Sequence, residues 1–267
     1  MTRWPAGTAL VAMLGVAVAR AAGADDGAGA VDGDPLEALY ALRYGVSTYP
    51  ESSVLAGGRA NVELPFHWVF YALRYRGVWV VIDPGFDDPG LVREYSVAWT
   101  DPGALLARIL PDAAQVGVVI VTHAHFDHVD RVGAYPEARI IISAEARAAV
   151  KRPQAAAFLR ASPRVTGFRG SVEVLPGLDV VEVGGHSPGS SVVRVQTRGR
   201  TIVLTGDEAY LPDNWKGPRA NGSTLDQAAN LSFLRSLKAE IDAGGAVAYT
   251  FHDPALVPGA DPIRRLQ

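Results

Sequence analysis

Cysteine is absent from the whole sequence of 267 residues. This absence excludes disulfide bonds, thiolate metal ligands, a cysteine nucleophile and the cysteine-based N-terminus of a lipid-anchored lipoprotein. A metal site or a catalytic centre in this chain must therefore be made from other side chains.

A surplus of positive charge is also absent. The chain has 25 Lys and Arg against 28 Asp and Glu, a formal net charge of −3, and no stripe of Lys and Arg. Because proteins bind a phosphate backbone mainly through such charges, we do not expect nucleic acid as a partner. Hydrophobic residues make up 48% and charged residues 20%. Such a chain can bury a sizeable core and shows no sign of disorder.

The N-terminal residues have the pattern of an export signal. Arg3 supplies a positive charge, Thr8–Ala19 is uncharged and mostly apolar, and the small residues at 19–24 provide two cleavage sites. The apolar stretch is well short of the roughly 20 residues that a spanning helix needs. We therefore predict a signal peptide over residues 1–21, a periplasmic or secreted mature protein, and no stable membrane anchor after cleavage.

The rest of the chain is expected to form one domain. Residues 22–35 are rich in Gly, Ala and Asp and predict a flexible lead-in, and residues 36–267 predict a single domain. A helix is expected from Asp101-Pro102 through Ile109, and another begins at a capping box formed by Thr224 and Gln227. Apolar runs predict strands at 66–75, 78–82, 116–121, 139–142, 172–175, 178–183, 192–196, 201–204 and 246–251. This alternation predicts an α/β fold, an αββα sandwich of two mixed sheets flanked by helices.

The densest group of ligand-type side chains is His123-Ala124-His125-Phe126-Asp127-His128, directly after the predicted strand at 116–121. In an extended segment the side chains at 123, 125 and 127 point to one side, and His128 joins them if a helix begins there. This spacing is typical of a metal site. The alternative is a His-rich loop on the surface.

Three further predicted strands end in a residue of the same kind. His186 follows the strand at 178–183, Asp207 follows the strand at 201–204, and His252 follows the strand at 246–251. A lone histidine at a strand end is more often packed or capped than a ligand. Because α/β proteins build sites along one edge of their sheets, four such strands favour one common site.

Together these segments offer five histidines and two aspartates. Because a structural zinc ion takes four ligands, seven predict two divalent metal ions that share a carboxylate. Imidazole with carboxylate suits Zn²⁺ first, with Fe, Mn or Co as alternatives. Two ions about 3.5–4 Å apart lower the pKa of a bridging water and polarise a carbonyl, which indicates a hydrolase.

The ligand pattern resembles that of the metallo-β-lactamase superfamily, with its His-x-His-x-Asp-His motif and three later single ligands. The resemblance spans Tyr40 to Pro254 and implies the metallo-β-lactamase fold. It also implies that Asp83 orients a ligand histidine, since the superfamily usually has Asp-Thr-Gly there; a turn residue before Pro84-Gly85 is the alternative. For the metals it implies one ion on His123, His125 and His186, the other on Asp127, His128 and His252, and Asp207 as the bridge.

Within the superfamily the chain is most similar to the N-acyl-homoserine-lactone lactonases. Tyr49-Pro50-Glu51, Leu64-Pro65-Phe66 and Asp207-Glu208-Ala209-Tyr210 carry this likeness. It implies that Tyr210 contacts the substrate carbonyl, and a packed aromatic residue is the alternative. Ser190 departs from the pattern, because these enzymes commonly have a histidine there. The lack of a cysteine ligand argues against class B β-lactamases, and His125 stands where the superfamily's diiron flavoproteins have Glu.

The function predicted from these residues is hydrolysis of a small-molecule lactone or ester, such as an N-acyl homoserine lactone, by attack of a metal-bridging hydroxide. Tyr210 would stabilise the oxyanion and Asp127 would help to protonate the leaving alkoxide. Two alternatives stay open. One is a thioester hydrolase of the glyoxalase II kind, although no basic patch for glutathione carboxylates is recognisable. The other is a non-catalytic exported protein that binds metal or a lactone. The oligomeric state is unknown.

Four residues outside the ligand set are open to two interpretations. His67 is expected to pack within a strand, and Phe86, Tyr95 and Trp99 to pack in the core. The alternative for each is a place in the wall of the substrate pocket.

Overall fold

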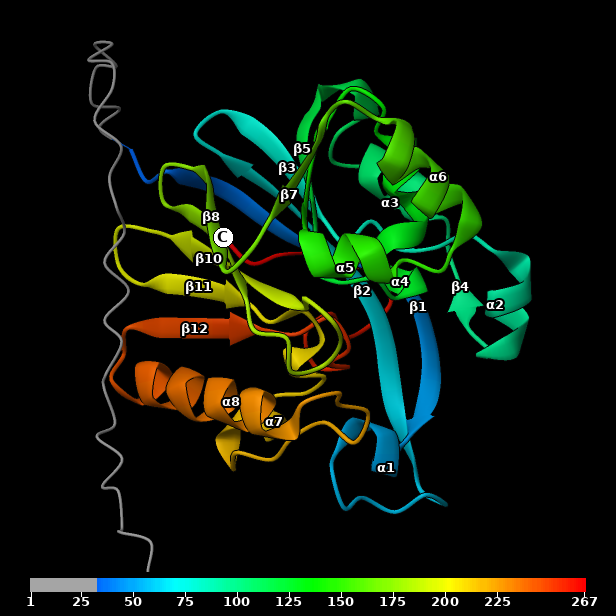
Figure 1. The fold of residues 1–267 in the computed structure, drawn as a ribbon, viewed down its shortest axis with the longest axis vertical. Coiled ribbons are helices and arrows are strands. Elements are labelled where there is room, and N and C mark those ends of the chain that lie inside the picture. The colour runs from blue at the N-terminus through cyan, green and yellow to red at the C-terminus, as the bar shows by residue number, and fades with distance from the viewer. Residues whose placement is uncertain (1–32) are drawn as a thin grey trace, which may run out of the picture. The chain divides into compact units, whose positions relative to one another are not determined.

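The computed structural model describes residues 33–267 (Figure 1). The predicted signal peptide and residues 22–32 of the predicted lead-in lie outside the described residues and stay predictions. Within Asp34–Gln267, which form one compact unit, two mixed β-sheets face each other and carry helices on their outer faces. The predicted αββα sandwich is confirmed.

The larger sheet has eight strands in the order β13-β1-β2-β3-β5-β6-β7, with β4 paired to β1. It is antiparallel from β13 to β3 and parallel from β3 to β7. Its strands are β1 (Leu36–Pro50), β2 (Glu63–Tyr75), β3 (Val78–Ile82), β4 (Ala98–Trp99), β5 (Val116–Val121), β6 (Arg139–Ser143), β7 (Val165–Phe168) and β13 (Ile263–Arg265).

The β1–β2 ribbon extends beyond the rest of this sheet. The two strands pair from Leu36 and Tyr75 as far as Pro50 and Glu63, whereas β3 pairs with β2 only over Tyr71–Tyr75. The far end of the ribbon therefore reaches past β3 and ends beside the short helix α1 (Glu51–Val54), as Figure 1 shows.

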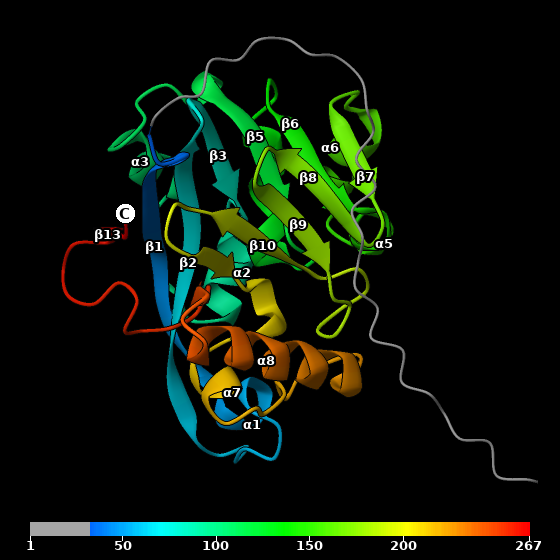
Figure 2. The same cartoon turned by 90° about the vertical axis from the view of Figure 1, so that its left-hand side faces the viewer.

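The smaller sheet has five strands in the order β12-β11-β10-β9-β8. Only β11 and β12 run parallel, and helix α8 (Gln227–Asp242) lies between them in the chain. This helix crosses the outer face of the sheet (Figure 2). The strands are β8 (Ser171–Leu175), β9 (Leu178–Glu182), β10 (Ser191–Gln196), β11 (Thr201–Leu204) and β12 (Ala246–Tyr249).

The other helices cover the outer faces or sit at strand ends. Helices α3, α5 and α6 pack on the larger sheet, and α7 packs with α8 on the smaller one. Among the described residues, no helix is long and apolar enough to cross a bilayer. The bounds are α2 (Pro89–Glu94), α3 (Pro102–Ala107), α4 (Phe126–Val129), α5 (Ala144–Ala149), α6 (Pro153–Ala161), α7 (Asp213–Lys216), and the 3₁₀ turns η1 (Ala113–Gln115), η2 (Asp130–Ala134) and η3 (Gly206–Glu208).

The alternation of side chains along the buried strands creates these layers. In β6, Ile141 points into the core between the two sheets, whereas Ile140 and Ile142 point to the helices outside. Since successive side chains of a strand face opposite ways, a strand buried on both sides must be apolar at every position. This is the reason that the predicted continuous apolar runs became central strands.

The predicted start of helix α8 is wrong in detail. Asp226, not Thr224, is its N-cap, and the Asp226 carboxylate accepts a hydrogen bond from the Ala229 N–H at 3.0 Å. The Thr224 hydroxyl instead donates to the Asn221 carbonyl at 2.9 Å. The predicted helix from Asp101 is confirmed, although it ends at Ala107 and not at Ile109.

Candidate metal centre

The seven predicted ligand residues meet at one edge of the sandwich. His123 and His125 follow β5, and Asp127 and His128 lie in the single turn of α4. The other three residues arrive singly, each after the C-terminal end of its strand: His186 after β9, Asp207 in η3 after β11, and His252 after β12. The structure therefore brings together all of the predicted ligands, from four separate strands.

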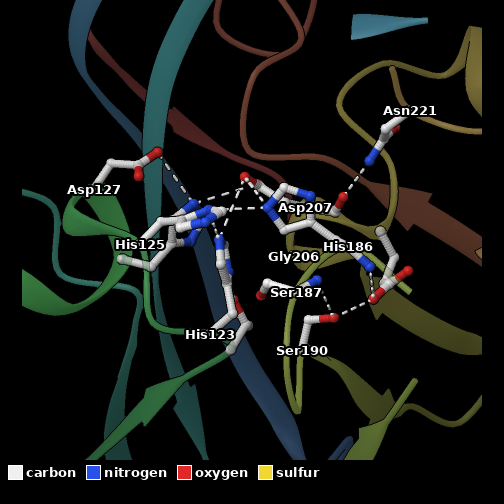
Figure 3. Close-up of polar contacts among 12 residues, drawn as sticks. His123, His125, Asp127, His186, Ser187, Ser190, Gly206, Asp207 and Asn221 are labelled. Atoms are coloured by element: carbon white, nitrogen blue, oxygen red, sulfur yellow. Dashed lines mark hydrogen bonds and ion pairs between the residues drawn. The ribbon is translucent and has the colours of Figure 1, made fainter. Parts of the chain in front are cut away.

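One half of the centre, which we call the three-histidine group, consists of His123, His125 and His186 around Asp207. Nδ1 of His125 lies 3.0 Å from Nε2 of His123 and 3.0 Å from Nε2 of His186. Oδ2 of Asp207 lies 3.5 Å from the His123 nitrogen and 3.6 Å from the His186 nitrogen. Figure 3 shows the three rings turned toward Asp207.

The other half, the two-aspartate group, consists of Asp127, His128 and His252 around the same Asp207. Nε2 of His128 lies 3.1 Å from Asp127 Oδ2 and 3.3 Å from Asp207 Oδ1. Nε2 of His252 lies 3.1 Å from Asp207 Oδ1 and 3.7 Å from Asp127 Oδ2. Asp207 thus presents one carboxylate oxygen to each group, which is the arrangement expected of a bridging ligand.

Three of the ligand histidines are oriented through the ring nitrogen that faces away from the centre. Nδ1 of His128 lies 2.7 Å from Asp83 Oδ2, Nδ1 of His123 lies 3.1 Å from Thr122 Oγ1, and Nδ1 of His252 lies 2.9 Å from the His67 carbonyl. Such contacts fix the tautomer and the tilt of a metal-binding imidazole. The contact of Asp83 with a ligand histidine agrees with the role that the family resemblance implied.

Burial and neighbouring charges prepare the side chains for a cation. Burial lowers the pKa of His186 to about 4 and that of His123 well below its usual value, so both imidazoles are neutral, the form that binds a metal. Burial raises the pKa of Asp207, but His128, His252 and His123 outweigh it and hold this pKa well below the usual range. The shared carboxylate is therefore ionised.

The donor set fits two divalent ions. In each group the four ligand atoms lie within 4.8 Å of one another. Nε2 of His128 is buried and has no hydrogen-bond partner among residues 33–267, although it faces two carboxylates. Imidazole nitrogens and carboxylate oxygens converging on two points are the ligands that borderline divalent metals prefer.

A cavity of about 210 Å³ opens above the two groups. Its wall contains six aromatic side chains, Tyr49, Phe66, Trp68, Tyr95, Phe126 and Tyr210. The other lining residues are His125, Asp127, His186, Asp207, Ser223 and His252. No lysine or arginine of the described chain lines it. The cavity therefore suits a small substrate without a negative charge.

Tyr210 lines the cavity. Its ring centroid lies 5.6 Å from that of His186 and 5.3 Å from that of His252, so it stands between the two groups. It also packs against the core, because Phe66 meets it edge-on at 5.7 Å. Both interpretations of Tyr210, cavity wall and packed aromatic, thus describe part of its surroundings.

The sequence interpretation missed most of the aromatic wall. Tyr95 lines the cavity although core packing was predicted for it, while Phe86 is fully buried as predicted. His67 packs within β2, as expected, and does not line the cavity. Phe126 and Trp68 carried a weak signal, since one stands inside the ligand motif and the other next to His67.

Comparison with known proteins identifies the family. A model of the metallo-beta-lactamase superfamily matches residues 68–252, a span that includes all seven ligand residues. This chain belongs to the metallo-beta-lactamase superfamily. The match confirms the resemblance drawn from the ligand spacing.

Relatives within the superfamily are lactonases by name. An N-acyl homoserine lactonase of Bacillus cereus is 29% identical over 141 residues, which cover 51% of this chain and 55% of that protein. The lactonase AttM of Azorhizobium caulinodans is 26% identical over 234 residues, which cover 79% and 81%. The chain thus spans a little more than half the length of the Bacillus cereus relative.

Solved structures of two lactonases share the fold. A quorum-quenching N-acyl homoserine lactone lactonase superposes with a TM-score of 0.74 at 20% identity, covering 86% of this chain and 97% of that one. AidC, a dizinc quorum-quenching lactonase with a bound product, superposes with a TM-score of 0.64 at 16% identity, covering 84% and 92%. At these identities the likeness establishes the αββα architecture.

Proposed function

We propose that this protein is a two-metal hydrolase that opens a small, uncharged lactone or ester, with N-acyl homoserine lactones as the leading substrate class. One observation carries the proposal: two ligand groups share Asp207 beneath a cavity walled by aromatic rings and free of lysine and arginine in the described chain. The named lactonases among its relatives support the substrate class.

The two ions are proposed to be Zn²⁺, since five imidazoles and two carboxylates suit zinc best, and Fe, Mn or Co are the alternatives. His123, His125, His186 and Asp207 would hold one ion, and Asp127, His128, His252 and Asp207 the other. When bound, such a pair of ions supplies a hydroxide nucleophile at neutral pH and polarises the substrate carbonyl.

The chain's own residues would do the remaining work. The Tyr210 hydroxyl would donate a hydrogen bond to the carbonyl oxygen as negative charge develops there. Asp127, on the cavity wall, would carry a proton to the leaving alkoxide. The aromatic rings would exclude water and hold the apolar part of the substrate, which strengthens every charge interaction inside the site.

The cavity lining weighs against the thioester alternative. A glutathione thioester carries carboxylates that need cationic partners, and the described cavity wall offers none. Its small volume also argues for a compact substrate, because pockets for larger ligands usually begin at about 300 Å³. A non-catalytic binding role fits less well, since the centre opens into this cavity.

A substrate panel tests the proposed reaction. The purified protein, with its metal content measured, should hydrolyse short-chain lactones or esters faster than glutathione thioesters or β-lactams. Removing the metal with a chelator should abolish the hydrolysis, and zinc should restore it. Preferred hydrolysis of a charged thioester would contradict the proposal, as would full metal content without turnover of any lactone or ester.

We also propose that the protein is exported to the periplasm or beyond the cell, with residues 1–21 as its signal peptide. The support is the positive Arg3, the apolar Thr8–Ala19 and the small residues that follow. The intact mass of protein from its native host should correspond to a start at Ala22 or Asp25. A full-length chain in the cytoplasm would contradict this.

A further inference from the structure

A second buried carboxylate lies behind the metal centre and has no place in the proposed reaction. Glu208 directly follows Asp207, is fully buried, and forms no ion pair with any cationic side chain of residues 33–267. A buried carboxylate without a cation is unfavourable unless hydrogen-bond donors surround it. Its partners therefore indicate what it does.

All the donors around Glu208 belong to the loop that carries His186 or to helix α8. Glu208 Oε1 accepts hydrogen bonds from the backbone N–H groups of Gly185 and His186, both at 3.1 Å, and from the Ser190 hydroxyl at 2.5 Å. Glu208 Oε2 accepts from the Asn230 amide at 2.7 Å. Hydrogen bonds to an ionised acceptor are about twice as strong as neutral ones.

His186 is the ligand that needs such support. His123, His128 and His252 each make a contact through the ring nitrogen that faces away from the centre. Nδ1 of His186 is buried and has no hydrogen-bond partner among the described residues. No hydrogen bond at this nitrogen orients His186, but its backbone N–H is bound by Glu208.

Gly185 leaves the space that the Glu208 carboxylate needs to reach the backbone of the His186 loop. A side chain at Gly185 would place its Cβ 2.5 Å from Glu208 Oε2 and 2.7 Å from the Asn230 nitrogen, closer than real atoms approach. Only glycine lets the carboxylate reach the backbone here. Ser190 donates to the carboxylate at the position where the lactonases that this chain resembles commonly have a histidine.

The same network also reaches the bridging aspartate. The Asn230 amide donates to the Glu208 carbonyl at 2.8 Å, and its oxygen accepts from the Asn221 N–H at 3.3 Å. The Asn221 amide in turn donates to the Asp207 carbonyl, and Figure 3 shows Asn221 on the side of Asp207 away from His125. Helix α8 is thereby joined to the metal centre through Glu208 and these two asparagines.

We infer that Glu208 is a positioning residue: through the Gly185 and His186 backbone it holds His186 in the geometry that the three-histidine group needs to bind its metal ion. The inference rests on the proposed two-metal centre. Its test uses zinc alone and no substrate, so a failure to hydrolyse lactones would leave it standing.

The test measures stepwise zinc affinity by competition with a chelator. His186→Ala and His252→Ala each remove a ligand from one group only and so assign the two binding steps. Glu208→Gln keeps the size of the side chain but turns an amide N–H toward donors. We expect it to weaken the three-histidine step about 10- to 100-fold, the usual effect of losing a group that supports a ligand. The step of the two-aspartate group should change less than about threefold.

A double-mutant cycle separates positioning from a general structural effect. If Glu208 acts through His186, adding Glu208→Gln to His186→Ala should weaken zinc binding by no more than about threefold further. If the losses of zinc affinity in the two single variants added fully in the double variant, the inference would be overturned. Equal weakening of both steps, or unchanged binding by a folded Glu208→Gln protein, would overturn it as well.

Two further variants keep the test decisive if Glu208→Gln does not fold. Ser190→Ala removes one donor and leaves the carboxylate, so the three-histidine step should weaken about fivefold, as expected for one hydrogen bond. No change there would then refute the inference. Glu173→Gln is the matched control, because Glu173 accepts a hydrogen bond from the Gly177 N–H at 3.0 Å in a turn with no ligand residue. Its zinc affinities should equal those of the unaltered protein.

Discussion

The two halves of the metal centre hold their histidines in different ways. In the two-aspartate group, His128 and His252 are buried and each is fixed through its far ring nitrogen, by Asp83 and by the His67 carbonyl. In the three-histidine group, only His123 is fixed in this way, by Thr122, while His125 is exposed and His186 is held through its backbone. In one half both histidines are thus supported at their rings, whereas in the other half one ligand histidine depends on the course of a loop.

The two groups also differ in the number of negative charges that they offer to a metal ion. The two-aspartate group has two carboxylates facing its nitrogens, whereas the three-histidine group has only the shared Asp207. Because a divalent cation gains more from two anionic ligands than from one, we expect the ion of the three-histidine group to leave first under a chelator. The comparison therefore predicts that one bridging residue joins two sites of unequal metal affinity.

The largest effect should follow removal of the residue that both halves share. Asp207→Ala takes a ligand from each group, so we expect the zinc content to fall from about two ions to below one per chain. Hydrolysis should drop on the order of a thousandfold or more, since several kcal/mol of transition-state stabilisation are lost. Metal analysis and kinetics check this, with the exposed Asp213→Ala as control. One tightly held ion that survives Asp207→Ala unchanged would mean that the halves are independent.

Tyr210 lies between the two groups and is not a predicted metal ligand, so changing it should not alter zinc binding by either group. Tyr210→Phe keeps the ring and removes the hydroxyl, so kcat on a lactone should fall about ten- to a thousandfold, the upper end being the loss of one oxyanion donor. The zinc content should stay the same. Equal kcat in both proteins would show that Tyr210 only packs against Phe66 and the ligand histidines.

Asp83→Asn tests whether the contact between Asp83 and the His128 ring supports zinc binding by the two-aspartate group. Asp83 has a φ of +53°, a backbone conformation that asparagine tolerates better than most residues, so the change mainly weakens the contact to His128. We expect zinc affinity of the two-aspartate group to fall about 10- to 100-fold, with little change in the other group. Stepwise zinc titration measures this, and a loss confined to the three-histidine group would reverse the comparison.

The smallest effect should come from the start of helix α8, which lies behind the three-histidine group. Asp226→Ala removes the N-cap and should lower the free energy of unfolding by about 1 kcal/mol. Thr224→Ala removes no cap and should cost less. Denaturant unfolding of the zinc-free proteins compares the two. A larger loss of unfolding free energy for Thr224→Ala would support the predicted capping box of Thr224 and Gln227.

Strand ends and ligands could be predicted because both leave local signals. The apolar run at 116–121 marks β5, and the motif from His123 to His128 follows at fixed spacing. The aromatic wall leaves no such signal, because the face on which Tyr95 or Trp68 lies depends on how distant strands pair. Glu208 was missed for a related reason: its donors come from residues 185, 186, 190 and 230, which only the fold brings together.

The overhanging β1–β2 ribbon has a consequence for how the protein could be changed. It supplies Tyr49, Phe66 and Trp68 to the cavity wall, yet none of the seven ligand residues lies on β1 or β2. The ribbon therefore shapes part of the cavity wall without providing a metal-ligand side chain, although the His67 carbonyl on β2 contacts the His252 ring. Ribbons from other members of the superfamily could be grafted at Ser47 and Trp68, where the Trp68 indole donates to the Ser47 hydroxyl at 2.9 Å. Selection among such chimaeras would vary the cavity wall while keeping the seven ligand side chains.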